Sequence, residues 1–402
     1  MSHATRQEVF YFEEIVDNDK DTKTTEETYT LSECHVLNDT SDLPSKRGGA
    51  TLTAVLAAQG NTLLYLIGGA NRAAETFGDV HVFDWDAKRW TQAKPSIGST
   101  TFTPRSGHTA VARGSRIYVF GGANLRVGAV FNDLHVLDTD TMTWSQPEVG
   151  GDVPPARNSH VAVATDKGMV VIGGSSPQVG AMNDVYLLAW DDDMSWRRIR
   201  PSSSTVMSKR ELHAACAIHD RILVVGGRSS SGILCDDVCE LHTDSWTWTI
   251  TPLTSWHRCA HAAGVLGGTH WVHFGGWGGG HDFLSDCWQL PVRPAACHDN
   301  VGIAGPPTSP TTLNAIEPCQ TSMHPVPLQV VHRHSPPPPP LEETPHIVDV
   351  ALVGSEEAGL VGRFAHCACV VEDASLVMFG GMTTDADLHD LWVLTRLPAN
   401  TT

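Results

Sequence analysis

Arginine and histidine recur together along this chain at one fixed spacing, and both side chains can take part in chemistry. The Arg-x-x-His element occurs five times, as Arg105/His108, Arg157/His160, Arg210/His213, Arg258/His261 and Arg363/His366. Histidine can act as a general acid or base or as a metal ligand, and arginine can hold an anion. Residues that occupy one position of every repeat serve the fold, whereas catalytic residues break that symmetry. We therefore expect this set to be structural, and we expect no catalytic residue.

Histidine and cysteine also gather in the second half of the chain, where they could form a metal site. The groups are His257, Cys259 and His261; Cys235 and Cys239; and His366, Cys367 and Cys369. None of them has the paired Cys-x-x-Cys spacing of a zinc-binding module. We therefore expect no metal and no cofactor. The ten cysteines have irregular spacings, which favours reduced thiols in a cytoplasmic protein, with the nucleus as the alternative location.

The same elements belong to a longer repeat. A Gly-Gly pair follows an apolar run six times, at Gly68 and Gly69, Gly121 and Gly122, Gly173 and Gly174, Gly226 and Gly227, Gly275 and Gly276, and Gly380 and Gly381. The steps between the pairs are 53, 52, 53, 49 and 105 residues. An aspartate follows each pair, and a tryptophan follows the first four aspartates; these residues are Asp79, Asp133, Asp184, Asp237, Asp286 and Asp390, and Trp90, Trp144, Trp196 and Trp248. Landmarks that keep one phase over six copies indicate a repeated structural unit.

The order of these landmarks resembles the kelch repeat, from Arg47 to Leu397 apart from one insertion. The resemblance implies an all-β fold, a six-bladed kelch-type β-propeller of four-stranded antiparallel blades. It also implies that the repeated arginine and histidine lie at the entry to the first strand, where they can bond to backbone carbonyls between blades. We expect the aspartate to accept backbone N–H bonds in the turn before the third strand, and the tryptophan to fill space between blades. The double glycine permits a turn with φ > 0 and close approach of the next blade.

The repeat divides the chain into four parts. Residues 1–46 form an acidic arm, and residues 28–37 within it have the fourth-strand spacing, so we expect this strand to pair with the last blade and close the ring. Residues 9–14 are a second candidate for that strand, or an extra outer strand. Residues 47–290 hold blades one to five, and 346–402 hold the last strand of blade five and blade six. Residues 291–345 are rich in proline, which removes donors from a strand ladder, so we expect a disordered insertion rather than a seventh blade.

Some enzymes have the same propeller architecture, so we consider two hypotheses, an enzyme and a binding protein. A copper site of the galactose oxidase kind needs spare tyrosines, but Tyr65, Tyr118 and Tyr186 all lie in expected strands. The chain also has no P-loop, no G-x-S-x-G and no H-E-x-x-H motif. We expect a non-enzymatic adaptor that binds a protein partner. The alternative is an enzyme, or a small-ligand or metal binder, that uses the axial channel.

The loops between each Gly-Gly pair and the following aspartate differ in every repeat. Variable loops on a rigid scaffold commonly carry recognition, and arginine and tryptophan are frequent binding hot spots. The candidate partner-binding residues are Arg72, Arg126, Arg228, Trp256, Trp277 and His281. For each of them, ordinary loop packing or solvation is the alternative interpretation. The sequence thus predicts a partner-binding rim at one mouth of the propeller.

Charge and composition bear on the other partners. The formal net charge of −18 argues against general binding to nucleic acid or to an anionic membrane surface, because both need a positive surface. No run of 18 apolar residues predicts a membrane span. The run Pro336–Pro340 favours a polyproline II helix, which domains of the SH3, WW or EVH1 type can bind. A simple spacer is the alternative interpretation of that run.

Overall fold

The computed structural model describes residues 8–11, 28–37, 42–96, 100–191, 194–253, 256–281, 283–292, 348–350 and 360–396. All of them belong to one unit, Met1–Pro294 with Pro345–Thr402, whereas a second unit, Ala295–Thr344, lies outside the described residues. The predicted insertion at 291–345 therefore lies outside them beyond its first two positions, and so does the run Pro336–Pro340. Every regular element in the described part of the chain is a β-strand, which confirms the all-β prediction.

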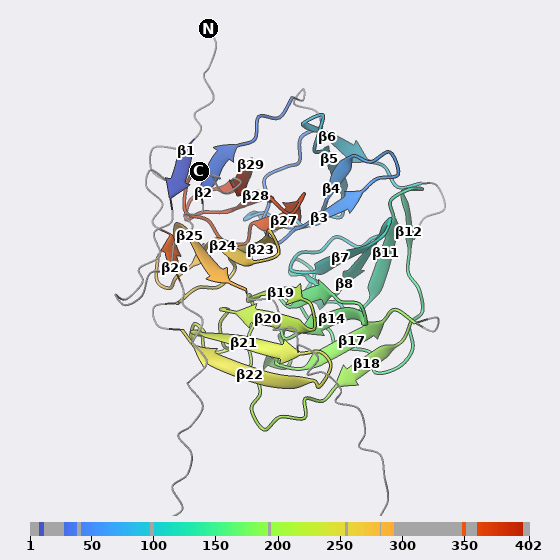
Figure 1. Ribbon diagram of the computed structural model, residues 1–402. Coiled ribbons are helices and arrows are strands. Elements are labelled where there is room, and N and C mark those ends of the chain that lie inside the picture. The colour runs from blue at the N-terminus through green and yellow to red at the C-terminus, as the bar shows by residue number, and fades with distance from the viewer. Residues whose placement is uncertain are drawn as a thin grey trace, which may run out of the picture. The chain divides into compact units, whose positions relative to one another are not determined.

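Each of the first four blades takes its four strands from one continuous stretch of the chain, and these strands form a four-stranded antiparallel sheet (Figure 1). Blade one has β3 (Thr51–Leu56), β4 (Thr62–Ile67), β5 (Val80–Asp84) and β6 (Arg89–Ala93). Blade two has β7 (Thr109–Arg113), β8 (Arg116–Phe120), β11 (Leu134–Asp138) and β12 (Thr143–Ser145). Blade three has β13 (Val161–Ala164), β14 (Gly168–Ile172), β17 (Val185–Ala189) and β18 (Trp196–Ile199). Blade four has β19 (Ala214–Ile218), β20 (Arg221–Val225), β21 (Asp237–His242) and β22 (Thr247–Pro252).

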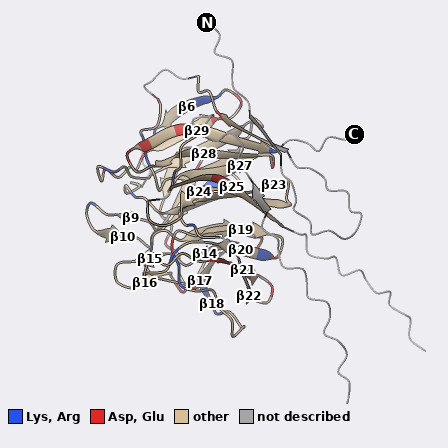
Figure 2. Ribbon diagram, turned by 90° about the vertical axis from the view of Figure 1, so that its left-hand side faces the viewer, with Lys and Arg blue, Asp and Glu red and all other residues tan. Residues whose placement is uncertain are grey.

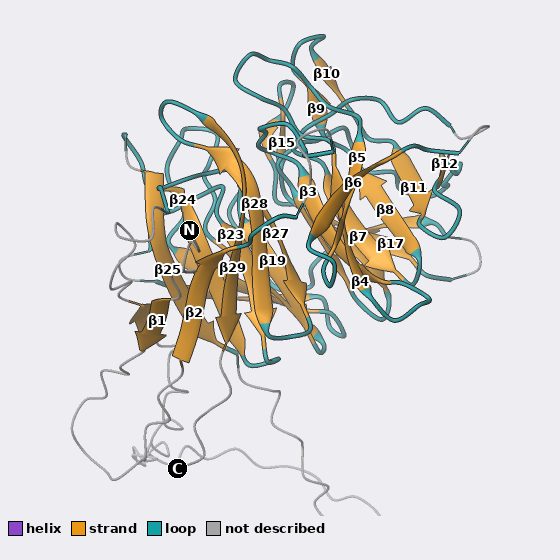
Figure 3. Ribbon diagram, turned by 90° about the horizontal axis from the view of Figure 1, so that it is seen from above, coloured by secondary structure: helices purple, strands orange, loops and turns teal. Residues whose placement is uncertain are grey.

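The last two blades take strands from distant parts of the chain. Blade five has β23 (Ala262–Leu266), β24 (His270–Trp277), β25 (Phe283–Pro291) and β26 (Val348–Val350), and β26 pairs antiparallel with β25. Blade six has β27 (Cys367–Val371), β28 (Ser375–Met382) and β29 (Asp387–Arg396), followed by β2 (Thr28–Glu33) and β1 (Glu8–Tyr11). These five strands lie in one sheet, with β2 beside β29 (Figure 3). Six blades are therefore present, as predicted.

The N-terminal strand β2 completes blade six. It pairs antiparallel with β29, so that Leu31 lies opposite Leu394 and Glu33 opposite Trp392. Tyr29 and Leu31 are 0% and 2% exposed in an apolar cluster with Trp392 and Leu394. The predicted closure by an N-terminal strand is thus confirmed. Strand β1 pairs on the outer side of β2, which is the extra outer strand foreseen as one of two roles for residues 9–14.

The apolar core consists of six clusters, one between each pair of neighbouring blades. In the cluster between blades six and one, Trp90 of β6 packs on Phe83 of its own blade and on Phe379 of blade six, at ring-centroid distances of 5.0 and 5.4 Å. The other three fourth-strand tryptophans occupy the clusters shared with the preceding blade; they are Trp144, Trp196 and Trp248. Each blade therefore buries one face against each neighbour, which a single four-stranded sheet cannot do alone.

The connections between blades protect the outer strands. Each donates a backbone N–H to a carbonyl in or just before the fourth strand of the blade that follows it. The bonds are Leu37 to Lys88 at 2.9 Å, Ser96 to Met142 at 2.8 Å, Asp152 to Trp196 at 2.8 Å and Ser202 to Trp246 at 3.0 Å. An open strand edge is a template for unwanted pairing with other chains. These bonds cover part of that edge in blades one to four.

Shortening Leu31 will measure how much the closing strand contributes to stability. We expect Leu31→Ala to lower the free energy of unfolding by about 2–5 kcal/mol, because a buried leucine is replaced by a cavity. Leu56→Ala is the matched control, because Leu56 is 71% exposed and its truncation is expected to change stability by less than about 0.5 kcal/mol. Urea unfolding monitored by tryptophan fluorescence gives both values. Equal effects of the two substitutions would contradict a structural role for β2.

Candidate partner-binding surface

A buried arginine ties the Gly-Gly turn of each blade to its third strand. In blade two, Nη1 and Nη2 of Arg105 donate to the two carboxylate oxygens of Asp133 at 2.5 and 3.0 Å. Nη1 also donates to the carbonyl of Gly121 at 3.0 Å. The arginine side chain is 0% exposed and the aspartate side chain 24%. Burial alone would raise the pKa of Asp133, but hydrogen bonds from His135 and Arg105 outweigh it and hold the pKa well below its usual range.

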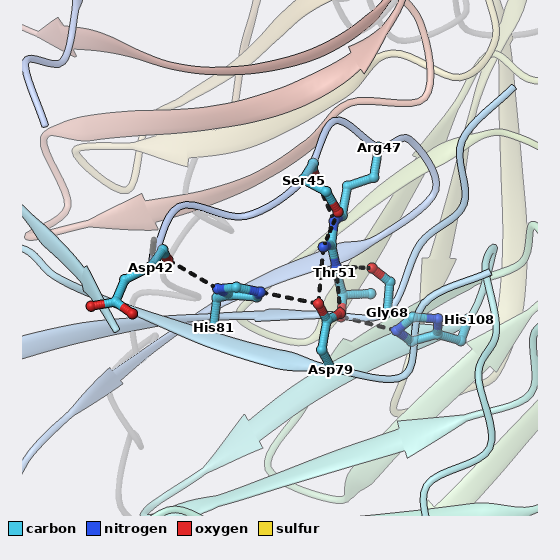
Figure 4. Close-up of polar contacts among 8 residues, drawn as sticks. All are labelled: Asp42, Ser45, Arg47, Thr51, Gly68, Asp79, His81 and His108. Carbon is cyan, nitrogen blue, oxygen red and sulfur yellow. Dashed lines mark hydrogen bonds and ion pairs between the residues drawn. The ribbon is translucent and has the colours of Figure 1, made fainter. Parts of the chain in front are cut away.

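The same arrangement is present in all six blades. The ion pairs are Arg47–Asp79, Arg105–Asp133, Arg157–Asp184, Arg210–Asp237, Arg258–Asp286 and Arg363–Asp390, with shortest N–O distances between 2.5 and 2.8 Å. Figure 4 shows the group in blade one, where the Arg47 guanidinium lies between Asp79 and the carbonyl of Gly68. The histidine is absent from this repeat, but Arg47 contacts the aspartate and the glycine carbonyl as its five counterparts do.

The backbone of these arginines joins each blade to its neighbour. The second glycine of one blade donates its N–H to the carbonyl of the arginine in the next. The bonds run from Gly69 to Arg105, Gly122 to Arg157, Gly174 to Arg210, Gly227 to Arg258, Gly276 to Arg363 and Gly381 to Arg47, at 2.8–3.0 Å. The last bond returns from blade six to blade one, so the series is circular.

Glycine is required at this contact. Gly68 has φ +64°, and a Cβ at this position would lie 2.7 Å from the Arg105 carbonyl oxygen and from Cε1 of His108. Any other residue would force the neighbouring blade away. The histidine of one blade therefore packs directly on the glycine of the preceding one, as His108 does here and His160 does on Gly121.

The structure refines the expected roles of the repeated residues. The guanidinium binds a carbonyl of its own blade, and it is the arginine's backbone carbonyl that makes the contact between blades. In blade two the aspartate accepts hydrogen bonds from guanidinium N–H groups, whereas backbone N–H donors were expected. The pairing of these two residue types was not predicted from the sequence. The signal was available, since they are 27 or 28 residues apart in five blades and 32 apart in blade one.

Two of the predicted rim arginines bind neighbouring loops. Nη1 of Arg72, in the blade-one loop, donates to the carbonyls of Thr383 and Thr384 in blade six, and its backbone N–H donates to the Asp387 carboxylate. In blade four, Nε of Arg228 donates to Oε1 of Glu211 at 2.9 Å. These side chains already hold loops together, so a partner would have to displace those contacts to bind them.

Two further rim residues lie at the blade-five loop. The guanidinium of Arg228 lies 5.8 Å from the ring centroid of Trp277, which is half-buried and donates from Nε1 to the carbonyl of Gly280 at 3.1 Å. His281 is exposed at the tip of the same loop. Trp277 thus presents part of its ring beside His281, on the border between the loops of blades four and five.

Trp256 does not lie on an accessible rim, and its inclusion in the predicted partner-binding set was wrong. It is 0% exposed and packs edge-on against His261, His273 and Trp288 at 5.1–5.8 Å between ring centroids. The physical reason is its place in the repeat. An apolar side chain just before the repeated arginine enters the inter-blade cluster in other blades too, as Phe102 and Met207 do.

Among the described residues of this mouth, the most exposed apolar side chains lie on three successive loops. The blade-two loop contains the two-stranded hairpin β9 (Ala123–Asn124) and β10 (Ala129–Val130), and the blade-three loop contains β15 (Ser175–Ser176) and β16 (Gly180–Ala181). Both hairpins project on the same side of the unit (Figure 2). Their tips and that of blade four expose Leu125, Val127, Val179 and Ile233 by 74%, 70%, 59% and 69%. Arg126 is exposed between the first two. We call these five residues the tip cluster.

The loops that carry the tip cluster are fixed by short-range contacts. The hydroxyl of Ser230 in the blade-four loop accepts a hydrogen bond from the Ala181 N–H of the blade-three loop at 2.6 Å. Asn124 donates from its side chain to the carbonyl of Pro104 at 3.1 Å. The tips are therefore held in place on a rigid base. Arg126 was predicted from the sequence, but the apolar residues of the tip cluster were not, although they lie in the same variable loops.

An open cavity of about 450 Å³ lies between blades two and three. Its walls are Asn132, Asp133, Leu134, Gln146, Pro147, Glu148, Val149, Val153 and Trp196. These residues come from the third strand of blade two, the connection to blade three and the fourth strand of blade three. None belongs to a first strand, so this cavity is not the axial channel.

Two further observations concern the described residues alone. They include no group of three or more histidine, cysteine, aspartate or glutamate side chains placed to hold a metal ion. They also include no helix with the length and apolar character needed to cross a bilayer.

Comparison with known proteins identifies related chains. Residues 17–227 and 107–311 match the family described as the KLHDC2/KLHL20/DRC7 Kelch-repeats domain. The chain is 30% identical to Kelch domain-containing protein 3 of Bos taurus over 217 residues, which is 50% of this chain and 56% of the relative. It is 35% identical to Acyl-CoA-binding domain-containing protein 4 of Arabidopsis thaliana over 152 residues (37% and 21%), and 27% identical to Adagio protein 3 of the same plant over 330 residues (75% and 52%). Each match spans less than two thirds of the relative's length.

Breaking one repeated ion pair will show how much it stabilises the ring. We expect Asp133→Ala to cost about 3–5 kcal/mol, because the Arg105 guanidinium is left buried without its counter-ion. The control is Arg116→Ala, which removes an ion pair to Asp138 whose arginine side chain is 61% exposed, and which is expected to cost about 1 kcal/mol or less. Chemical denaturation provides both free energies. A cost below about 1 kcal/mol for Asp133→Ala would contradict the framework role of the pair.

Stability will fall steeply on mild acidification. Burial, followed by the charge of a nearby arginine, lowers the pKa of His108, His213 and His366 from 6.5 to about 3. Between these values the unfolded chain binds protons that the folded chain does not, so stability is complete above pH 6.5 and is lost as the pH falls towards 3. Each histidine contributes about 1.4 kcal/mol per pH unit inside that window.

Urea unfolding at a series of pH values gives the free energy of unfolding as a function of pH and so checks this expectation. Between pH 6 and pH 4.5, the number of protons taken up on unfolding is expected to be smaller by about one in His213→Gln than in the wild type. Stability that stays flat from pH 7 to about pH 5 would show that the buried histidines do not remain neutral in the folded state.

Proposed function

Because this chain belongs to the kelch-repeat family, we propose that it is a non-enzymatic adaptor that binds a protein partner through the tip cluster on blades two, three and four. Propellers of this family are in general protein-interaction modules. The observation that carries the proposal is the exposure of Leu125, Val127 and Ile233, each about 70% or more of its possible surface. Exposed apolar side chains on successive loops of a rigid base are typical of a surface that a partner covers.

The contacts of the predicted rim residues indicate which of them hold loops in place and which are accessible to a partner. Arg72 and Arg228 are engaged with Thr383, Thr384 and Glu211, so they set loop positions. Arg126 is exposed between two apolar residues and is free to contact a partner's acceptor group. Trp277 and His281 extend the accessible surface towards blade five. Trp256 is excluded from it by burial.

The other predicted partners stay predictions. A domain that binds proline motifs would act on Pro336–Pro340, outside the described residues. The net charge of −18 continues to favour a protein partner over nucleic acid or an anionic membrane. A cytoplasmic location, with the nucleus as alternative, is part of the same proposal.

Comparing two surface variants in the native cell tests this function. The tip variant combines Leu125→Ser, Val127→Ser and Ile233→Ser, and the control is Leu56→Ser. Leu56 is 71% exposed at the β3–β4 turn, at the opposite end of a blade. We expect affinity purification with mass spectrometry to lose a partner by at least about tenfold in the tip variant, because apolar contact area is removed. The control should keep that partner, and both variants should keep the melting temperature.

Two results would count against the proposal. An unchanged partner set in the tip variant would show that the tip cluster is not the binding surface. Loss of the same partner in Leu56→Ser would place binding at the other mouth or would indicate a general effect on the protein.

A further inference from the structure

The fourth strand of blade three, β18, and the start of the connection that follows it carry an unusual density of positive charge. Arg197, Arg198 and Arg200 are all exposed, in a chain with only 27 lysines and arginines against 45 acidic residues. Arg197 pairs with Asp191, and the guanidinium of Arg198 lies 6.0 Å from the ring centroid of Tyr186. Strand pairing does not require arginine at these positions, because the ladder between β17 and β18 uses only backbone groups.

A cluster of hydroxyl groups follows these arginines. Ser202, Ser203, Ser204 and Thr205 occupy an irregular, mostly exposed segment between the end of β18 and Met207, which is 0% exposed. Ser203 follows Arg200 by three residues and Arg198 by five. In an extended segment alternate side chains share one side, so these two guanidinium groups would lie on one side, upstream of the hydroxyl. An enzyme with acidic pockets at that spacing could bind both.

We propose that Ser203 is a phosphorylation site for a protein kinase that selects arginine three and five residues before its target. The kinase transfers the γ-phosphoryl group of Mg-ATP to Oγ of Ser203. The new Oγ–P bond forms as the bond from the γ-phosphorus to the bridging oxygen of ADP breaks. The hydroxyl proton passes to the catalytic carboxylate of the kinase, and ADP leaves. This site is independent of the proposed partner-binding tips.

The contacts of Ser203 give the modification a structural effect. Its Oγ accepts the N–H of Trp248 in β22 at 3.0 Å and donates to the carbonyl of Thr205 at 2.7 Å. Ser202 donates its N–H to the carbonyl of Trp246 at 3.0 Å and its hydroxyl to that of Ser245. A phosphoryl group is too large for the position of the hydroxyl, and it carries about two negative charges that Arg198 and Arg200 can pair with. Phosphorylation therefore releases the connection and uncovers the outer edge of β22.

Phosphosite mapping on the purified full chain tests the assignment. The protein is incubated with Mg-ATP and protein kinase B, a kinase of this arginine-directed class. We expect phosphate on Ser203 and none in Ser203→Ala. Incorporation should fall at least tenfold in the double variant Arg198→Ala with Arg200→Ala. The control removes two other exposed arginines, Arg113→Ala with Arg116→Ala, and should be phosphorylated like the wild type.

A second measurement tests the structural effect. Hydrogen exchange of the Trp248 amide should become faster in the phosphorylated chain, whereas amides paired between β20 and β21 should keep their protection. Phosphate on another residue of the segment would overturn the assignment of Ser203. Phosphate incorporation that does not depend on Arg198 and Arg200 would overturn it as well. An unchanged Trp248 amide in fully phosphorylated protein would overturn the release of the connection.

Discussion

The buried guanidinium of the repeated arginine is the interaction on which the rest of this structure depends. It binds an aspartate and a glycine carbonyl inside its blade, and the carbonyl of the same residue accepts a bond from the preceding blade. A buried charge is strongly destabilising when its counter-ion is missing, so each blade must place its aspartate correctly. One residue type thereby fixes both the shape of a blade and its distance from its neighbour, six times in a circle.

The fold could be predicted because its determinants are periodic in the sequence. The glycine pairs, the aspartates and the fourth-strand tryptophans keep their phase, and the strand around Leu31 has the spacing of a fourth strand. The pairing of arginine with aspartate was harder to foresee, since it depends on geometry across about 28 residues. Trp256 shows the opposite error. Its residue type suggested a binding hot spot, but its position before Arg258 places it in the core between blades.

The candidate binding surface was predictable only in part, for a physical reason. Variable loops can be recognised from sequence, but exposure cannot, because it depends on contacts between loops of different blades. Arg72 and Arg228 were selected for their charge, and they bind atoms of neighbouring loops. Leu125 and Val127 resemble ordinary core residues in sequence, yet the short hairpin β9–β10 carries them into solvent. The residues proposed to bind a partner are thus ones that break the symmetry of the scaffold.

Closure by β2 has a consequence for how the protein is made. Strand β2 is synthesised long before its partner β29, and Leu31 cannot contact Leu394 until β29 has emerged. At about 5–20 residues per second, that interval is roughly 20–70 s. During this time blades one to five can fold in order of synthesis, while Tyr29 and Leu31 have no apolar surface of blade six to bury against. The ring is therefore completed only after β29 has emerged, and until then the growing chain presents the uncovered apolar side chains Tyr29 and Leu31 to the cell's chaperones.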